Sequence, residues 1–295
     1  MRLVTAPSGH RLLLIWRTEF VFYTPERRQL GDEWNQVRLT SARLSEGPNL
    51  INHRLDGPLP FADELFDAIY TFHLIEHLSR RDNERFIRDI YRLLKPGGIY
   101  RAATPDLEFL ATEYLQGLHQ QMAFASVENY NRYQWALCNL IDQCTREVSG
   151  GEMLEVLRRG EYTPDDVTHM NGDLLRYLFP PSSVPPAPHA ATARPVNAHI
   201  LKKILRFLRK IAGTFRRRLS RRSSQKSYLE LTYEKNLWLW DRISLSRLLT
   251  DAGFRNVTAF DHRTSSIPGW NRYNFDQSAF GDHPLEPSLY MEGTK

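Results

Sequence analysis

The sequence has few cysteines and no long apolar runs. Only two of its 295 residues are cysteines, Cys138 and Cys144. Six positions along one helix turn two side chains about 120° apart, so we expect no disulfide between them, and no metal motif includes them. The apolar run from Leu12 to Trp16 is too short for a signal peptide or a membrane span. These absences point to a reducing compartment, the cytoplasm.

Acidic residues are missing from one long segment. Residues 181–228 contain 12 Lys and Arg and neither Asp nor Glu, whereas the remainder holds 27 Lys and Arg against 34 Asp and Glu. The net charge of +5 therefore combines an acidic globule with one basic segment. Within that segment, residues 198–222 follow a proline-rich stretch at 180–195 and carry an apolar stripe flanked by Lys and Arg. This pattern predicts an amphipathic helix after a linker.

Two partners and one purely structural role suit this basic helix. Basic residues beside an apolar stripe are typical of helices that lie on anionic membranes, which predicts peripheral binding at the inner face of the membrane. Nucleic acid is a weaker alternative, because aromatic stacking residues are sparse. In the structural role the stripe packs on the domain. We expect salt-sensitive binding to anionic vesicles that deletion of 198–222 abolishes.

The most regular part of the sequence runs from Leu59 to Asp106. Residues 66–72 (FDAIYTF) form an apolar, β-prone run, and residues 99–103 form a second one. Between them, Ser79 can cap a helix with apolar residues at helical spacing, which Lys95-Pro96-Gly97-Gly98 ends. Two buried strands joined by one helix predict a right-handed βαβ unit with parallel strands.

This block resembles the class I S-adenosylmethionine (SAM) dependent methyltransferases. The resemblance rests on the LPF turn, the FDAIY strand, the HLIEHL strand end and the LLKPGG turn, which occur here in family order. It extends through NRYQWALCNLIDQCTREVSGGEM, LWLWDRISLSRLLTDAGFRNV and the C-terminal PSLYMEGTK, which are similar to a bacterial subfamily of predicted methyltransferases. It implies an α/β fold, a Rossmann-like seven-stranded methyltransferase sheet with a helical insertion.

Four regions follow from this reading. Residues 1–115 form the N-terminal part of the sheet domain, with strands expected at 19–23, 37–39 and 50–53, the first of them paired with 12–16. Residues 116–180 form the helical insertion, and 181–228 the linker and basic helix. Residues 229–295 complete the sheet with a helix at 244–252 and strands at 254–260 and 289–292.

The resemblance also implies positions for the cofactor. It places these residues beside SAM: Thr24, Asp56, Phe61, Thr71 and Phe72. Three features of the family's cofactor site are missing. No glycine follows the strand expected at 19–23 until Gly31, and Arg38 and Arg54 stand where the family has acids for the ribose and the adenine. Arginine has only donors, so it cannot accept a hydrogen bond from a ribose hydroxyl.

Two functions therefore compete at this stage. The first is SAM-dependent methyl transfer to a small molecule or glycan. The second is a degenerate methyltransferase that binds no cofactor and serves as a scaffold or as a partner subunit of a homologous enzyme. The missing features predict weak SAM binding or none.

His73 is the candidate catalytic residue, because it follows a strand at the carboxyl edge of the sheet, where it can act as a base or position the substrate. The alternative is that His73 and His77 only cap and pack the next helix. Together with Glu76 they have the H-x-x-E-H spacing of some zinc peptidases. Because the motif starts at a strand end rather than on a helix, we expect no metal site.

Candidate substrate-binding residues lie on the inserted helix predicted over 130–148. Tyr133, Asp142 and Arg146 share a polar row with Trp135 and Gln143 that could contact a sugar or a carboxylate. In the structural alternative, Asp142 and Arg146 form an i,i+4 ion pair. The apolar stripe expected to pack this helix consists of four residues: Leu137, Ile141, Cys144 and Val148.

Overall fold

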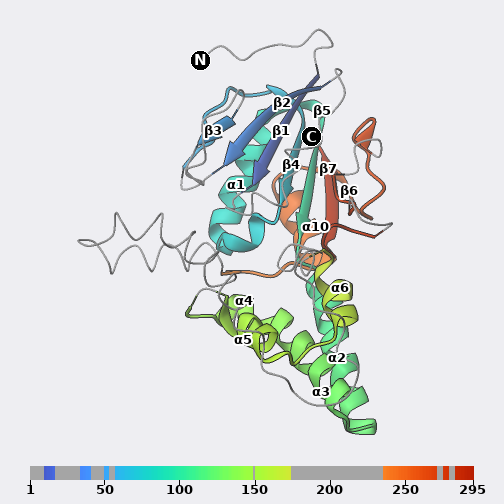
Figure 1. Cartoon of the computed structure of the whole chain (residues 1–295). Helices are drawn as coiled ribbons and strands as arrows, with labels where there is room; N and C mark the ends of the chain where they lie inside the picture. Colours follow the sequence, from blue (N-terminus) through green and yellow to red (C-terminus); the bar gives the residue numbers. More distant parts are fainter. Residues whose placement is uncertain are drawn as a thin grey trace, which may run out of the picture.

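In a computed structural model of the chain, the structure describes residues 10–16, 34–40, 50–52, 57–148, 150–173, 235–270, 275–278 and 283–295. A twisted sheet forms the upper part of the molecule, and a block of helices lies below it (Figure 1). The chain is therefore an α/β protein with a helical insertion, as the sequence predicts.

Seven strands form one sheet in the order β3-β2-β1-β4-β5-β7-β6. Their bounds are β1 His10–Trp16, β2 Trp34–Thr40, β3 Leu50–Asn52, β4 Phe66–Phe72, β5 Leu94–Thr104, β6 Arg255–Phe260 and β7 Leu289–Thr294. The five strands β3, β2, β1, β4 and β5 are parallel to one another. Strand β7 is antiparallel to both β5 and β6. The central parallel pair β4–β5 and the antiparallel pair β6–β7 confirm the predicted arrangement.

One face of the sheet is covered by α1 (Arg80–Leu93) and α10 (Arg242–Asp251). The predicted cap of α1 is confirmed, since the Ser79 hydroxyl accepts the Asp82 N–H at 3.1 Å. Alternate residues of β1 point to opposite faces. Leu13 and Ile15 join the core under these two helices, whereas Leu12 and Leu14 join the core on the other face.

The second face is covered by the connection between β6 and β7, through Ile267, Trp270 and Phe275. A buried arginine on β5 holds this connection. Arg101 donates to Asp276 at 2.8 and 3.0 Å and to Glu292 at 2.7 Å, and none of the three is more than 2% exposed.

The helical block has its own core. Its helices are α2 (Leu107–Ala123), α3 (Val127–Leu137), a π-helix (Cys138–Asp142), α4 (Gln143–Thr145), α5 (Gly151–Arg159) and α6 (Pro164–Asn171). The predicted apolar stripe is wrong, because Ile141 and Val148 are exposed while Trp135 and Asp142 are buried. The wider turn of the π-helix changes which residues face inward.

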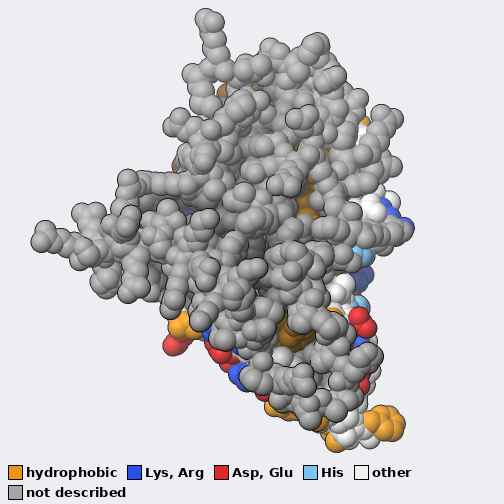
Figure 2. Space-filling model, in the orientation of Figure 1, with side chains coloured by type: hydrophobic (Ala, Val, Ile, Leu, Met, Phe, Trp, Pro, Cys, Tyr) orange, Lys and Arg blue, Asp and Glu red, His pale blue; other side chains and the backbone are white. Residues whose placement is uncertain are grey.

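Large apolar side chains are exposed where α2 meets α3. Met122, Phe124 and Val127 are 76–79% exposed, and Figure 2 shows hydrophobic side chains at this lower end of the helical block.

None of the helices described here combines the length and the hydropathy that crossing a bilayer requires.

The first strand was predicted in the wrong place. β1 at His10–Trp16 lies between β2 and β4, in the position expected for 19–23. The expected strand at 19–23 lies outside the described residues, as do the linker and basic helix at 181–228. Membrane binding through 198–222 stays a prediction.

Candidate functional site

The candidate site begins where the chain leaves β4. His73 follows the last residue of this strand, and its backbone has a positive φ of 44°. Its N–H donates to the carbonyl of Ala103 on β5 at 2.9 Å, which keeps the turn against the neighbouring strand. A positive φ is uncommon outside glycine and often marks a functional turn. The imidazole is thereby fixed at the carboxyl edge of the sheet.

Three side chains surround the imidazole of His73. Its Nε2 lies 2.9 Å from Ser288 Oγ and 3.9 Å from Glu286 Oε2, and its Nδ1 lies 3.4 Å from Glu76 Oε1. Glu76 belongs to the short 3-10 helix after β4 (Ile75–His77), whereas Glu286 and Ser288 immediately precede β7. We call these four residues the His73 cluster.

The charges of the His73 cluster depend on one another. Burial by itself lowers the pKa of His73, but the charge of Glu286 and the hydrogen bond and charge of Glu76 outweigh it and raise the pKa to about 9. Burial raises the pKa of Glu76, but His73 and His77 outweigh it and the pKa falls. At neutral pH, His73 is therefore a cation beside the Glu76 carboxylate, and it can act as a base only after it loses a proton.

Glu76 links three parts of the site. Its buried carboxylate accepts the Thr104 hydroxyl at 3.1 Å, which ties the end of β4 to the end of β5. Its carbonyl accepts the N–H groups of Leu237 at 2.7 Å and of Trp238 at 3.1 Å. The segment that leads into α10 is thus fixed to the same edge of the sheet.

A small polar hollow lies between this edge and the helical block. Its volume is about 20 Å³. It is lined by Pro105, Asp106, Leu110, Asn139, Gln143, Met170, Asn171, Asn236, Glu286 and Pro287. We call it the amide hollow, because four of its residues carry amide side chains. Glu286 belongs to both the amide hollow and the His73 cluster.

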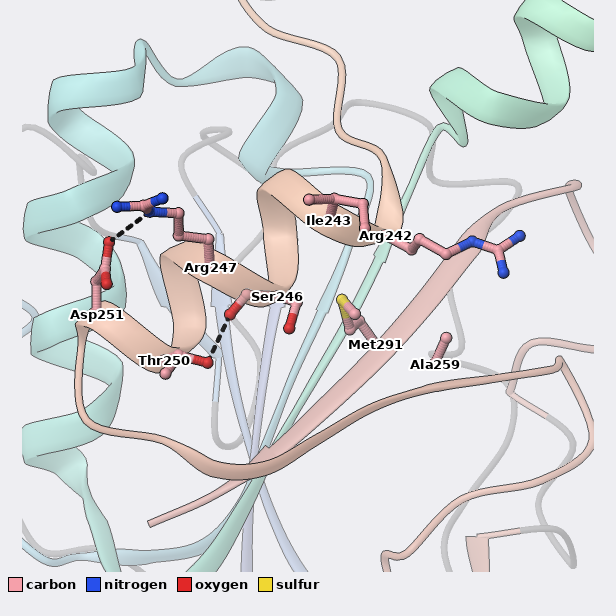
Figure 3. Close-up of a pocket in the computed structure, with 8 residues that line it drawn as sticks. All are labelled: Arg242, Ile243, Ser246, Arg247, Thr250, Asp251, Ala259 and Met291. Carbon is pink, nitrogen blue, oxygen red and sulfur yellow. Dashed lines mark hydrogen bonds and ion pairs between the residues drawn. The ribbon is translucent and has the colours of Figure 1, made fainter.

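A larger depression of about 500 Å³ lies elsewhere, on α10 and the strands β6 and β7. Figure 3 shows that it is lined by the outer side of α10, with the ion pair between Arg247 and Asp251 at 3.7 Å and the hydrogen bond from Thr250 to Ser246 at 2.9 Å. These polar groups are satisfied within one helix, so the depression does not gather reactive groups as the His73 cluster does.

The structure brings some of the predicted cofactor residues together. Thr71, Phe72 and His73 are consecutive at the end of β4, and the Phe72 ring lies 4.5 Å from the His73 ring. The Thr71 side chain is buried and hydrogen bonds to Tyr100 at 2.8 Å, so it does not line an open site. Phe61 packs edge-to-face on Phe66 at the amino end of β4, 5.1 Å between centroids. Its place beside the cofactor stays a prediction.

Other predicted cofactor positions change or cannot be placed. β2 continues to Thr40, and Arg38 pairs with Leu14 and Leu50 inside the sheet. Arg38 thus lies two residues before Thr40, which ends β2, and its alignment with the ribose acid stays a prediction. Thr24, Arg54 and Asp56 lie outside the described residues.

The predicted substrate residues do not converge on His73. Asp142 accepts the Glu152 N–H at 2.7 Å and pairs with Arg146 at 2.6 Å, so it holds the start of α5. Tyr133 lies between helices, with its ring 6.0 Å from that of Tyr114. These contacts are structural. Only their neighbour Gln143 lines the amide hollow.

Sequence reasoning missed Glu286, Ser288, Asn139 and Asn236. A polar loop before the last strand, Glu286-Pro287-Ser288, is the one signal that could have indicated the first two. Asn139 and Asn236 have no such signal, because their positions depend on how the helical block packs.

Comparisons with known proteins agree with this architecture. Residues 31–102, which span β2 to β5, match the methyltransferase domain family. A "Probable S-adenosylmethionine-dependent methyltransferase" of Mycolicibacterium smegmatis is 30% identical over 80 residues, which cover 27% of this chain and 30% of that protein. The chain thus spans less than a third of this curated relative.

Two solved structures illustrate the structural likeness. A SAM-dependent methyltransferase of Mesorhizobium loti is 14% identical with a TM-score of 0.28, over 36% of this chain and 51% of that one. A SAM-dependent methyltransferase of Thermotoga maritima, described as a possible histamine N-methyltransferase, is 13% identical with a TM-score of 0.37, over 98% and 83%. At such scores we draw no argument from either structure.

The sheet and the turn after β4 define a Rossmann-like methyltransferase fold. The match to the methyltransferase domain family over residues 31–102 covers β2, β3, β4 and most of β5 of this fold.

Proposed function

We propose that this protein transfers the methyl group of SAM to a small-molecule or glycan acceptor at the carboxyl ends of β4 and β5. The observation that supports this most is the match of residues 31–102 to the methyltransferase domain family, because these residues include the strands that form the cleft. The His73 cluster adds a partly buried group of charged side chains at this edge. Ligands of open α/β sheets bind at such an edge.

The chemistry asks little of the protein. SAM, when bound, supplies a sulfonium methyl group, and the acceptor supplies an electron pair. The residues of this chain have to hold the acceptor in line and take up its proton. Because His73 is protonated at neutral pH, we assign it first to positioning, through Ser288 Oγ at 2.9 Å and the Glu286 carboxylate at 3.9 Å.

The grounds for the degenerate alternative lie in the N-terminal part of the chain. Arg38 lies in β2, two residues before the last residue of that strand. The lack of glycine remains, since none occurs between Trp16, the last residue of β1, and Gly31. The match of residues 31–102 to the methyltransferase domain family supports the enzyme.

Isothermal titration of the full chain with SAM and with S-adenosylhomocysteine tests the proposal. We expect micromolar affinity for both. If neither ligand binds at millimolar concentration, while the protein is folded by circular dichroism, the degenerate reading replaces the enzyme.

A further inference from the structure

The amide hollow is built from side chains whose orientations are fixed. Asn171 donates to Asn139 Oδ1 at 2.6 Å, and Trp135 donates to Asn171 Oδ1 at 3.0 Å. On the other side, Asn236 donates through Nδ2 to Gln143 Oε1 at 3.1 Å and through its backbone N–H to the Gln143 carbonyl at 2.9 Å. These bonds connect α3, the π-helix, α4, α6 and the segment before α10, so the amides cannot turn independently.

One acceptor in this arrangement has no donor. Asn236 is 4% exposed, and its Oδ1 makes no hydrogen bond among the described residues. An unsatisfied buried carbonyl oxygen costs about 1–3 kcal/mol. Because Nδ2 of the same amide is engaged with Gln143, the amide cannot rotate to satisfy the oxygen without losing that bond. The oxygen therefore calls for a donor that the described residues do not supply.

The hollow is also acidic. Asp106 and Glu286 line it, and no Lys or Arg is among its ten described lining residues. Asp106 caps α2 through the Glu108 N–H at 2.9 Å, and Glu286 faces His73 at 3.9 Å. Burial raises the pKa of both carboxyl groups, and for Glu286 the nearby Glu76 adds to the rise, although His73 opposes it. Negative charge at this place is thus only partly compensated.

We propose that the amide hollow binds the ammonium group of an amine ligand, with Asn236 Oδ1, Asp106 and Glu286 as acceptors. An ammonium group brings three donors and one positive charge. It is also about the size that a 20 Å³ hollow admits, because one water-sized group needs about 10–15 Å³. A carboxylate or phosphate brings no donor and meets two acids. A hydroxyl brings one donor and no charge.

The hollow shares Glu286 with the His73 cluster. The amine ligand is therefore assigned to the methyl acceptor, with its ammonium group as the anchor and another of its atoms, one that carries an electron pair, as the atom that is methylated. This assignment rests on the proposed function. The binding of an ammonium group does not rest on it.

Methylammonium chloride is the probe, added to the full chain labelled with ¹⁵N, with the Asn236 side-chain amide observed by NMR. We expect saturable shifts with methylammonium. Methanol, and sodium acetate at the same ionic strength, should give none. Equal saturation by methanol or by acetate would overturn the assignment.

Two variants and one control locate the binding. Glu286→Gln keeps the shape and removes one charge, and Asn236→Leu removes the unsatisfied oxygen. Each should weaken methylammonium binding at least about tenfold. Glu84→Gln is the control, because it removes an exposed charge paired with Arg88 on α1, outside the hollow, and it should bind as the parent does. If Asn236→Leu does not fold, Glu286→Gln alone decides. Unchanged affinity in a folded Glu286→Gln variant rejects the proposal.

The same samples are titrated with SAM. Methylammonium binding without SAM binding keeps the amide hollow and rejects the methyltransferase proposal. SAM binding without methylammonium binding rejects the amide hollow as an ammonium site and keeps the methyltransferase proposal.

Discussion

His73 Nε2 lies 3.9 Å from Glu286 Oε2, a contact between the turn after β4 and the loop before β7. The two residues are far apart in the sequence, and the antiparallel pairing of β5 with β7 brings them to one edge of the sheet. This relationship joins the predicted catalytic residue to a carboxylate that no motif indicated. It also gives the site a measurable dependence on pH.

We expect the charge on His73 to stabilise the fold at neutral pH. Its pKa is raised from 6.5 to about 9, so folding favours the imidazolium. This contribution is complete below pH 6.5 and is lost as the pH rises through 9. It is on the order of 3 kcal/mol. Urea denaturation of the parent and of His73→Asn should show a stability difference that shrinks across this window.

Two controls accompany the measurement. His119→Asn changes an exposed histidine on α2 and separates a general effect of losing a histidine from the effect at this site. In Glu286→Gln, NMR titration should find the pKa of His73 moved from about 9 toward 6.5, because the carboxylate that raises it is gone. An unmoved His73 titration would show that Glu286 does not set this charge.

The sequence predicts the second half of the sheet better than the first. β4, α1, β5 and α10 carry apolar periodicity together with caps or glycine stops, so local and long-range signals agree. Near the N-terminus, two adjacent apolar runs, 12–16 and 19–23, compete for the first strand. Only the pairing with β2 and β4 selects the earlier run, and pairing is a tertiary property.

The sequence predicts the candidate site only where its residues follow from a local pattern. His73 is predictable, because the end of a central parallel strand is a local feature of the sequence. Glu286 and Ser288 reach it through the β5–β7 pairing, and Asn236 reaches the amide hollow through the packing of the helical block. The sequence predicts that Asp142 and Arg146 contact the substrate as parts of a polar row, but the π-helix turns Asp142 toward α5. Local pattern alone does not reveal such contacts.

Replacing Arg101 should destabilise the protein strongly. Arg101→Met leaves the carboxylates of Asp276 and Glu292 buried without their cation. We expect a loss of about 3–5 kcal/mol in urea denaturation. Arg242→Met is the control, because its pair with Glu108 is exposed and should contribute about 0–1 kcal/mol. Similar losses in the two variants would show that the buried network does not hold the β6–β7 connection.

The Arg101 network also reaches the candidate site. The Asp276 carbonyl accepts the Leu285 N–H at 2.8 Å, immediately before Glu286. Where Arg101→Met still folds, the pKa of His73 should therefore fall, because Glu286 is less firmly held. A His73 titration identical to that of the parent would show that the two networks are independent.

Asp142 should prove structural. Asp142→Ala removes the acceptor for the Glu152 N–H and leaves Arg146, only 9% exposed, without its carboxylate. We expect a loss of about 3 kcal/mol in the free energy of unfolding. SAM affinity, measured by titration below the melting range, should stay the same. A variant of unchanged stability with a raised KM for the acceptor would return Asp142 to the substrate site.

Gly151 tests the same contact from the other side. It begins α5 with a φ of 51°, and a Cβ built on it would overlap both carboxylate oxygens of Asp142. Gly151→Ala therefore combines backbone strain with displacement of the carboxylate, and we expect a loss of about 3 kcal/mol. Gly160 follows the end of the same helix with a φ of 71°, but a Cβ there meets nothing within 4 Å. Gly160→Ala introduces only the backbone strain, and we expect it to lower the free energy of unfolding by about 1 kcal/mol. Thermal or urea unfolding of the two variants separates the backbone strain from the displacement of the Asp142 carboxylate. Equal losses would mean that the Asp142 carboxylate moves aside without cost and does not fix the start of α5.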